Sequence, residues 1–234
     1  MSRHFSDYTT DIGLSNLARL ADPSTNANDY SNALYLLGKE LGEVLAKQIS
    51  DENKNICVAC TVEDADFLAK GIIDSLSDLY SDISLACFWN QRQQALSIAP
   101  IIKKYSEPAV NDANVLVIVK SIISSACVVK TNLTNLIQDS EPNRIFVVAP
   151  VMHCDAQEKL NKEFPDIIAK KFEYIYFAVD DEMETNGNLA PGIGGNVYQR
   201  LGFKDQDDKN KFIPKLVKER RDSLISSSKQ KIAV

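Results

Sequence analysis

Five short apolar runs, rich in β-branched and aromatic residues, recur along the chain at residues 56–62, 83–89, 114–119, 144–150 and 174–179. Runs of this kind are typical of strands that are buried on both faces. Stretches with helical spacing lie before and between them, at 31–49, 64–80, 127–139 and 156–164. Because strand and helix alternate, the sequence predicts an α/β fold: a parallel sheet flanked by helices.

Composition narrows the class of protein. No apolar window reaches the roughly 18 residues of a membrane span, and the polar start lacks the apolar core of a secretory signal, so we expect a cytoplasmic protein with no membrane contact. The net charge of -6 makes nucleic acid an unlikely partner. The last 31 residues carry nine Lys or Arg against five Asp or Glu, so a protein partner is expected to use this tail, unless its basic run is only a solvated helix face.

A glycine-rich segment, "LAPGIGG" at 189–195, follows the last apolar run. With the residues before it, it resembles the signature region of uracil phosphoribosyltransferases, and the two align without a gap. The matching positions are Ala178, Asp180, Gly187, Pro191, Gly192 and Gly194. A turn and long helix upstream extend the resemblance, which covers residues 16–203 and leaves 1–15 as an N-terminal extension and 204–234 as a basic helical tail.

The resemblance implies the type I phosphoribosyltransferase fold, with a hood or arm near the glycine loop, and a homodimer. In that family, backbone groups of the glycine loop contact the nucleobase. The corresponding residues here are Leu189, Ala190, Gly192, Gly194 and Gly195. The alternative is that the turn persists only because the backbone shape demands glycine.

The loops that would hold phosphoribosyl pyrophosphate depart from the family pattern. In the phosphate loop Lys120 replaces an acidic residue, and the threonine and two glycines that follow in the family are replaced. The residues of this loop are Lys120, Ser124, Ser125, Ala126 and Cys127. In the two pyrophosphate loops, acidic groups stand where the family has an arginine, and another arginine position is lost or displaced. The residues there are Glu63, Asp64, Trp89, Asn90 and Arg92.

These departures favour a pseudoenzyme that binds a pyrimidine nucleobase or nucleotide, or acts as a partner-binding regulatory subunit. One alternative is an active enzyme of pyrimidine salvage that makes UMP from uracil, with Lys120 or Arg92 replacing the missing cation and Glu63 or Asp64 the missing acid. The other is a structural scaffold in a multiprotein complex. No catalytic residue can be assigned, no cofactor is expected, and Mg²⁺ is expected only with catalysis.

The cysteines offer two further hypotheses. Cys57 and Cys60 have C-x-x-C spacing, but their apolar run favours a buried strand over a metal site, and no metal is expected. Cys127 lies at a helix start, which would lower the pKa of its thiol. Cys154 follows His153, and the two would act as nucleophile and base only if the fold brings them together.

Overall fold

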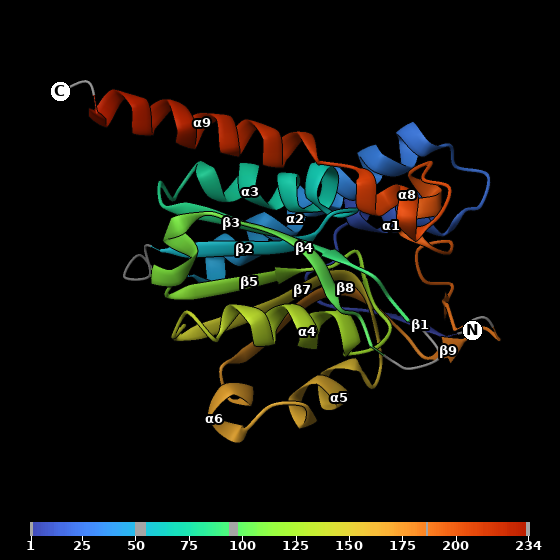
Figure 1. Ribbon diagram of the computed structural model, residues 1–234. Coiled ribbons are helices and arrows are strands. Elements are labelled where there is room, and N and C mark those ends of the chain that lie inside the picture. Colours follow the sequence, from blue (N-terminus) through green and yellow to red (C-terminus); the bar gives the residue numbers. More distant parts are fainter. Residues whose placement is uncertain (1, 50–54, 94–97, 186, 233–234) are drawn as a thin grey trace.

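The structure, a computed structural model, describes residues 2–49, 55–93, 98–185 and 187–232, with side chains to Ser226. All five predicted strands are present, and they run parallel in the order β8-β7-β5-β2-β3 (Figure 1). Their bounds are β2 (Ile56–Thr61), β3 (Ile83–Asn90), β5 (Val115–Val119), β7 (Arg144–His153) and β8 (Phe172–Asp180). The predicted fold class is therefore confirmed.

The sheet is completed by short strands, which the apolar pattern does not reveal. β1 (Arg3–Phe5) pairs antiparallel with β8, and β4 (Ile101–Ser106) pairs antiparallel with β3, so each edge of the sheet is antiparallel. β6 (Ile122–Ile123) adds to β7. β9 (Glu182–Met183) and β10 (Leu189–Ala190) form a small ribbon beside the glycine loop, where the arm is expected.

Helices cover both faces of the sheet and create two separate cores (Figure 1). One face carries α1 (Asp11–Ala21), α2 (Ala27–Gln48), a π-helical turn η1 (Ala65–Ala69) and α3 (Lys70–Ser77). The other carries α4 (Cys127–Leu136) and α5 (Ala156–Lys162), with α6 (Asp166–Ala169) beyond them. Cys57 belongs to one core and Cys60 to the other, as alternation along a strand requires, so these two thiols do not share a site.

The last segment lies against this body. It contains α7 (Val197–Arg200), α8 (Gln206–Lys211) and α9 (Lys215–Ile232), and α9 contacts η1. Asp66 accepts hydrogen bonds from the backbone N–H groups of Lys215 and Leu216, at 2.9 and 2.8 Å, and so caps α9 from a distant part of the chain. A 3₁₀ turn, η3 (Pro108–Asp112), precedes β5. Over the described ranges, no helix combines the length and apolar character that a membrane span needs.

Candidate functional site

A cavity of about 180 Å³ lies at the carboxyl ends of the parallel strands. Open parallel sheets place their ligands at this edge. The cavity brings together side chains from every loop singled out in the sequence, and two more from α8. The charged and polar residues that line it are Glu63, Asn90, Arg92, Lys120, Ser124, Ser125, Asn188, Asn196, Tyr198, Gln206 and Lys209. Leu189 and Gly195 contribute from the glycine loop.

Lys120 is held at the floor of the site by three acceptors. Its Nζ donates to Thr61 Oγ1 at 3.0 Å, to Glu63 Oε1 at 3.1 Å and to Asp64 Oδ2 at 2.7 Å. A lysine ammonium has three protons, so this group has no donor left for a phosphate. Asp64 is fully buried and also accepts the Thr61 hydroxyl, at 2.6 Å, and the Ser121 N–H, at 3.2 Å.

Lys120, Glu63 and Asp64 meet as an ion-paired cluster. Compared with the pattern that the resemblance to uracil phosphoribosyltransferases implies, the charges at 120 and 63 are reversed, so we call this the reversed ion-pair cluster. Sequence comparison loop by loop does not reveal this pairing, because the partners lie 56 and 57 residues apart.

The electrostatics keep Lys120 and Glu63 ionised. Burial alone would lower the pKa of Lys120, but Asp64 and Glu63 outweigh it and the net pKa is raised. Burial would likewise raise the pKa of Glu63, yet Lys120 and Lys209 lower it to about 2. Both partners thus remain charged at neutral pH.

Lys209 is a site residue that the sequence does not identify. It lies in α8, is only 4% exposed, donates to the backbone oxygen of Asn90 at 3.0 Å, and approaches Glu63 Oε2 at 3.6 Å. Its surroundings in the sequence, "QDDKNK", are typical of a solvated helix and give no signal of burial. Within the described residues Glu63 Oε2 is buried and accepts no hydrogen bond, so its recorded partner is the Lys209 ammonium.

Arg92 supplies the remaining cation of the cavity. The Gln206 side chain holds its backbone, accepting from the N–H at 2.8 Å and donating to the carbonyl at 3.1 Å. Among the residues that the structure describes, the Arg92 guanidinium forms no ion pair. Asn90 is occupied by a reciprocal pair of hydrogen bonds with Asn132, at 2.8 and 3.1 Å.

Other predicted residues lie outside the cavity lining. The Trp89 indole N–H donates to the backbone oxygen of Phe212 at 2.8 Å, which anchors the C-terminal segment to β3. Ala126 and Cys127 begin α4, but they do not line the cavity. The expected low pKa at Cys127 is wrong, since burial raises it despite the opposing effect of Arg92 and Lys130.

The glycine loop divides into a structural part and a part that lines the cavity. Gly192 has φ +54°; its N–H donates to Asp180 Oδ2 at 2.9 Å and its carbonyl accepts from Arg3 at 2.6 Å. Gly194 has φ +72°, and a Cβ there would overlap the backbone oxygen of Leu20. Neither residue lines the cavity, and nor does Ala190. Gly195, at φ +107°, has open space where a Cβ would stand and does line it.

His153 and Cys154 are brought together by the fold. Cys154 Sγ lies 3.8 Å from His153 Nδ1, at the end of β7. However, the thiol points its hydrogen to Asp155 Oδ1 at 3.5 Å, and partial desolvation, together with Asp155, raises the pKa of Cys154. A protonated thiol is a poor nucleophile, so this geometry does not favour a nucleophile and base pair.

Comparison with known proteins gives a partial match in sequence and a match in fold. No protein-family model matches the chain. A uracil phosphoribosyltransferase of Sulfurisphaera tokodaii is 26% identical over 87 residues, which span 37% of this chain and 38% of that protein.

Among solved structures, the AQ2163 protein from Aquifex aeolicus superposes with a TM-score of 0.67 at 16% identity, covering 82% of this chain and 94% of its own. A hypoxanthine-guanine phosphoribosyltransferase from Bacillus anthracis gives a lower TM-score, 0.42, at 12% identity, covering 66% of this chain and 76% of its own. The AQ2163 protein shares the helix-flanked sheet with this chain.

Proposed function

We propose that this chain binds a pyrimidine nucleobase or a small nucleotide-related ligand in the cavity and does not transfer a phosphoribosyl group. One observation carries the proposal: Lys120 donates all three of its protons to Thr61, Glu63 and Asp64. The groups that would have to hold magnesium or pyrophosphate instead neutralise each other.

Few charges in the cavity remain unpaired, which favours a ligand with little charge of its own. Lys120 and Lys209 are both paired with Glu63, and Asp64 pairs with Lys120 as well, so Arg92 is the one lining cation with no recorded ion pair among the described residues. Phosphoribosyl pyrophosphate carries several negative charges and normally requires a metal ion and more than one cation. Breaking a buried ion pair to free a second cation would cost about 3–5 kcal/mol.

The size and lining favour a nucleobase. Pockets for drug-sized ligands measure about 300–1,000 Å³, whereas this cavity measures about 180 Å³. Asn188 and Asn196 supply amides, which combine donors and acceptors as the edge of a pyrimidine does. Tyr198 supplies an aromatic ring on which a base can stack, and burial raises the pKa of its hydroxyl, which keeps it a donor. The resemblance of the glycine loop to that of uracil phosphoribosyltransferases, and the partial match to such an enzyme, support a pyrimidine.

Calorimetric titration with uracil, uridine and UMP, and separately with phosphoribosyl pyrophosphate and Mg²⁺, tests this proposal. We expect saturable binding of a pyrimidine ligand, no binding of the sugar pyrophosphate and no formation of UMP. Tyr198→Ala should weaken binding about 5- to 150-fold, because stacking on a base contributes about 1–3 kcal/mol. Asn28→Ala, on an exposed position of α2, is the control and should leave binding unchanged.

Two results would overturn the proposal. Release of pyrophosphate with formation of UMP would show that the reversed ion-pair cluster still supports catalysis. Absence of binding by every pyrimidine would instead favour the scaffold, and the cavity would then have no ligand of this class.

A further inference from the structure

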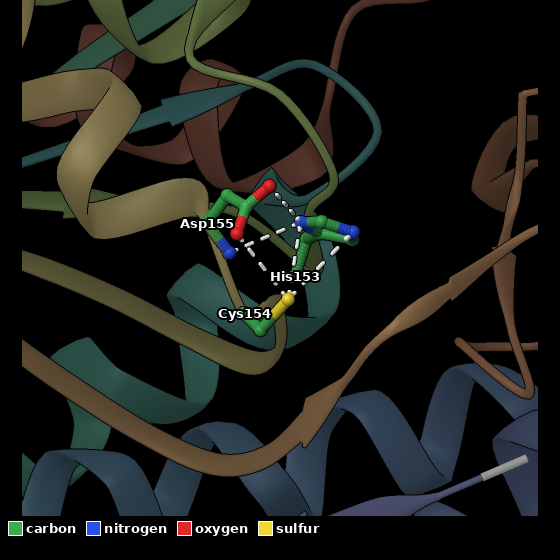
Figure 2. Close-up of side chains that lie close together, drawn as sticks. All are labelled: His153, Cys154 and Asp155. Carbon is green, nitrogen blue, oxygen red and sulfur yellow. Dashed lines mark hydrogen bonds and ion pairs between the residues drawn. The ribbon is translucent and has the colours of Figure 1, made fainter.

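Three consecutive residues with different metal-binding atoms meet at the end of β7. His153 is the last residue of the strand, and Cys154 and Asp155 lead into α5. Figure 2 shows the three side chains pointing toward one another. The Cys154 N–H donates to the backbone oxygen of Asp180 at 3.0 Å, which fixes this turn against the end of β8.

The distances among the three donor atoms approach those of a metal site. Nδ1 of His153 lies 3.8 Å from Cys154 Sγ and 3.9 Å from Asp155 Oδ2, and Sγ lies 3.5 Å from Oδ1. Bonds of about 2.0–2.3 Å in a tetrahedral zinc site place ligand atoms roughly 3.3–3.6 Å apart. Nδ1 and Sγ approach different oxygens of the Asp155 carboxylate, and one donor atom from each residue lies within 4.8 Å of the other two. Rotation of the exposed Asp155 carboxylate, together with contraction of the trio, would bring one oxygen, Nδ1 and Sγ into zinc geometry. It is the single group of three such side chains found within the described ranges.

The contacts that a metal would displace are weak ones. The Asp155 N–H donates to His153 Nδ1 at 3.1 Å, and Lys159 approaches Asp155 Oδ2 at 3.3 Å. Lys159 and Asp155 are both exposed, and such an ion pair contributes about 0–1 kcal/mol. His153 is mostly buried, so its ring is already positioned, whereas Cys154 and Asp155 are exposed and open to an ion from solvent.

We propose that His153, Cys154 and Asp155 bind Zn²⁺ through Nδ1, the thiolate sulfur and one carboxylate oxygen. This reverses the expectation from sequence that the chain has no metal site. An imidazole and a thiolate are ligands for zinc and not for Mg²⁺ or Ca²⁺, which take oxygen. On binding, the thiol proton passes to solvent and the imidazole keeps its proton on Nε2.

Three protein ligands leave the fourth tetrahedral position to water or to another molecule. None of the three residues lines the cavity. The zinc site and the proposed pyrimidine site can therefore be tested separately, and either proposal can fail alone.

The test is titration of the metal-free full chain, carrying no added histidines, with Zn²⁺ in competition with a chromophoric chelator, and with Co²⁺ followed by absorbance. We expect one equivalent of Zn²⁺ and a near-ultraviolet cobalt–thiolate band. Cys154→Ser and Asp155→Asn should each weaken zinc binding more than about tenfold, since even outer-shell changes cost 10–100-fold. Cys154→Ser should also abolish the cobalt–thiolate band.

Histidine provides a matched control, because the chain has two. His153→Gln should weaken zinc binding, while His4→Gln, in the exposed strand β1, should not. Cys154 and Asp155 are exposed, so their variants remain informative if His153→Gln fails to fold. Zinc binding that is unchanged in Cys154→Ser and Asp155→Asn, or no stoichiometric binding by the unaltered chain, would overturn the proposal.

Discussion

Replacing Lys120 with methionine tests the reversed ion-pair cluster most directly. Methionine keeps an unbranched apolar chain but removes the charge, which leaves Asp64, fully buried, and Glu63, 12% exposed, without the cation between them. Removing one partner of a buried ion pair costs about 3–5 kcal/mol of unfolding free energy, because the remaining charge is uncompensated. We expect a loss of this size at pH 7.

The pKa of Glu63 gives a second magnitude for the same ion pairs. It falls from 4.5 to about 2 on folding, a shift of roughly 2.5 units, which corresponds to about 3 kcal/mol at roughly 1.4 kcal/mol per unit. Because the folded pKa is depressed, this stabilisation is fully present above pH 4.5 and is lost as pH falls toward 2. The difference between the unaltered chain and Lys120→Met should therefore be largest near neutral pH and shrink in acid.

Urea unfolding at pH 7 and at pH 3, followed by fluorescence, measures both effects. Trp89 is the single tryptophan of the chain and is 1% exposed, so its emission reports the core beside the site. Lys70→Met is the matched control, since Lys70 pairs with Asp74 on the surface of α3 and should cost at most about 1 kcal/mol. A loss below about 1 kcal/mol for Lys120→Met at pH 7 would refute the argument that the cluster stabilises the fold.

The other predictions concern the glycine loop, the C-terminal segment and assembly. Gly192→Ala should destabilise the chain by more than about 1 kcal/mol in urea unfolding, because φ is +54° and the new Cβ would overlap the Leu189 carbonyl. Gly13→Ala, in helix α1, is the control and should not destabilise the chain. Asp66→Ala should cost about 1 kcal/mol and speed proteolysis within α9, since it removes both cap hydrogen bonds; equal proteolysis rates would contradict this. Sedimentation equilibrium should give twice the 26.0 kDa chain mass if the predicted homodimer forms, and a single-chain mass would exclude it.

The central fold was predictable because its signals are local. A strand buried on both faces, such as β5, has an unbroken apolar sequence, whichever strands it pairs with. β4 could not be found this way, since Lys103 and Lys104 interrupt its apolar pattern at a partly solvated edge. β1 has only three residues, and its pairing with β8 is invisible to any local window.

The site was predictable in its place and not in its chemistry. Loops that follow parallel strands lie at one edge of the sheet, so the sequence predicts that Glu63, Lys120 and Gly195 lie close together. All three line the cavity. Whether Lys120 faces a ligand or two buried carboxylates depends on side-chain packing across strands, which spacing does not encode. Lys209 joins the cavity through the docking of α8, a tertiary contact between segments far apart in the sequence.

The pairing of β1 with β8 has a consequence for folding during synthesis. Arg3 forms two hydrogen bonds, each 2.7 Å long, with the buried carboxylate of Asp180, 177 residues later. At about 5–20 residues per second, a ribosome needs roughly 9–35 s to make the chain between them. The first strand must therefore wait, unpaired, while the rest of the sheet is made. When Asp180 emerges, its arginine partner is already present, so this edge is one of the last parts of the sheet to close.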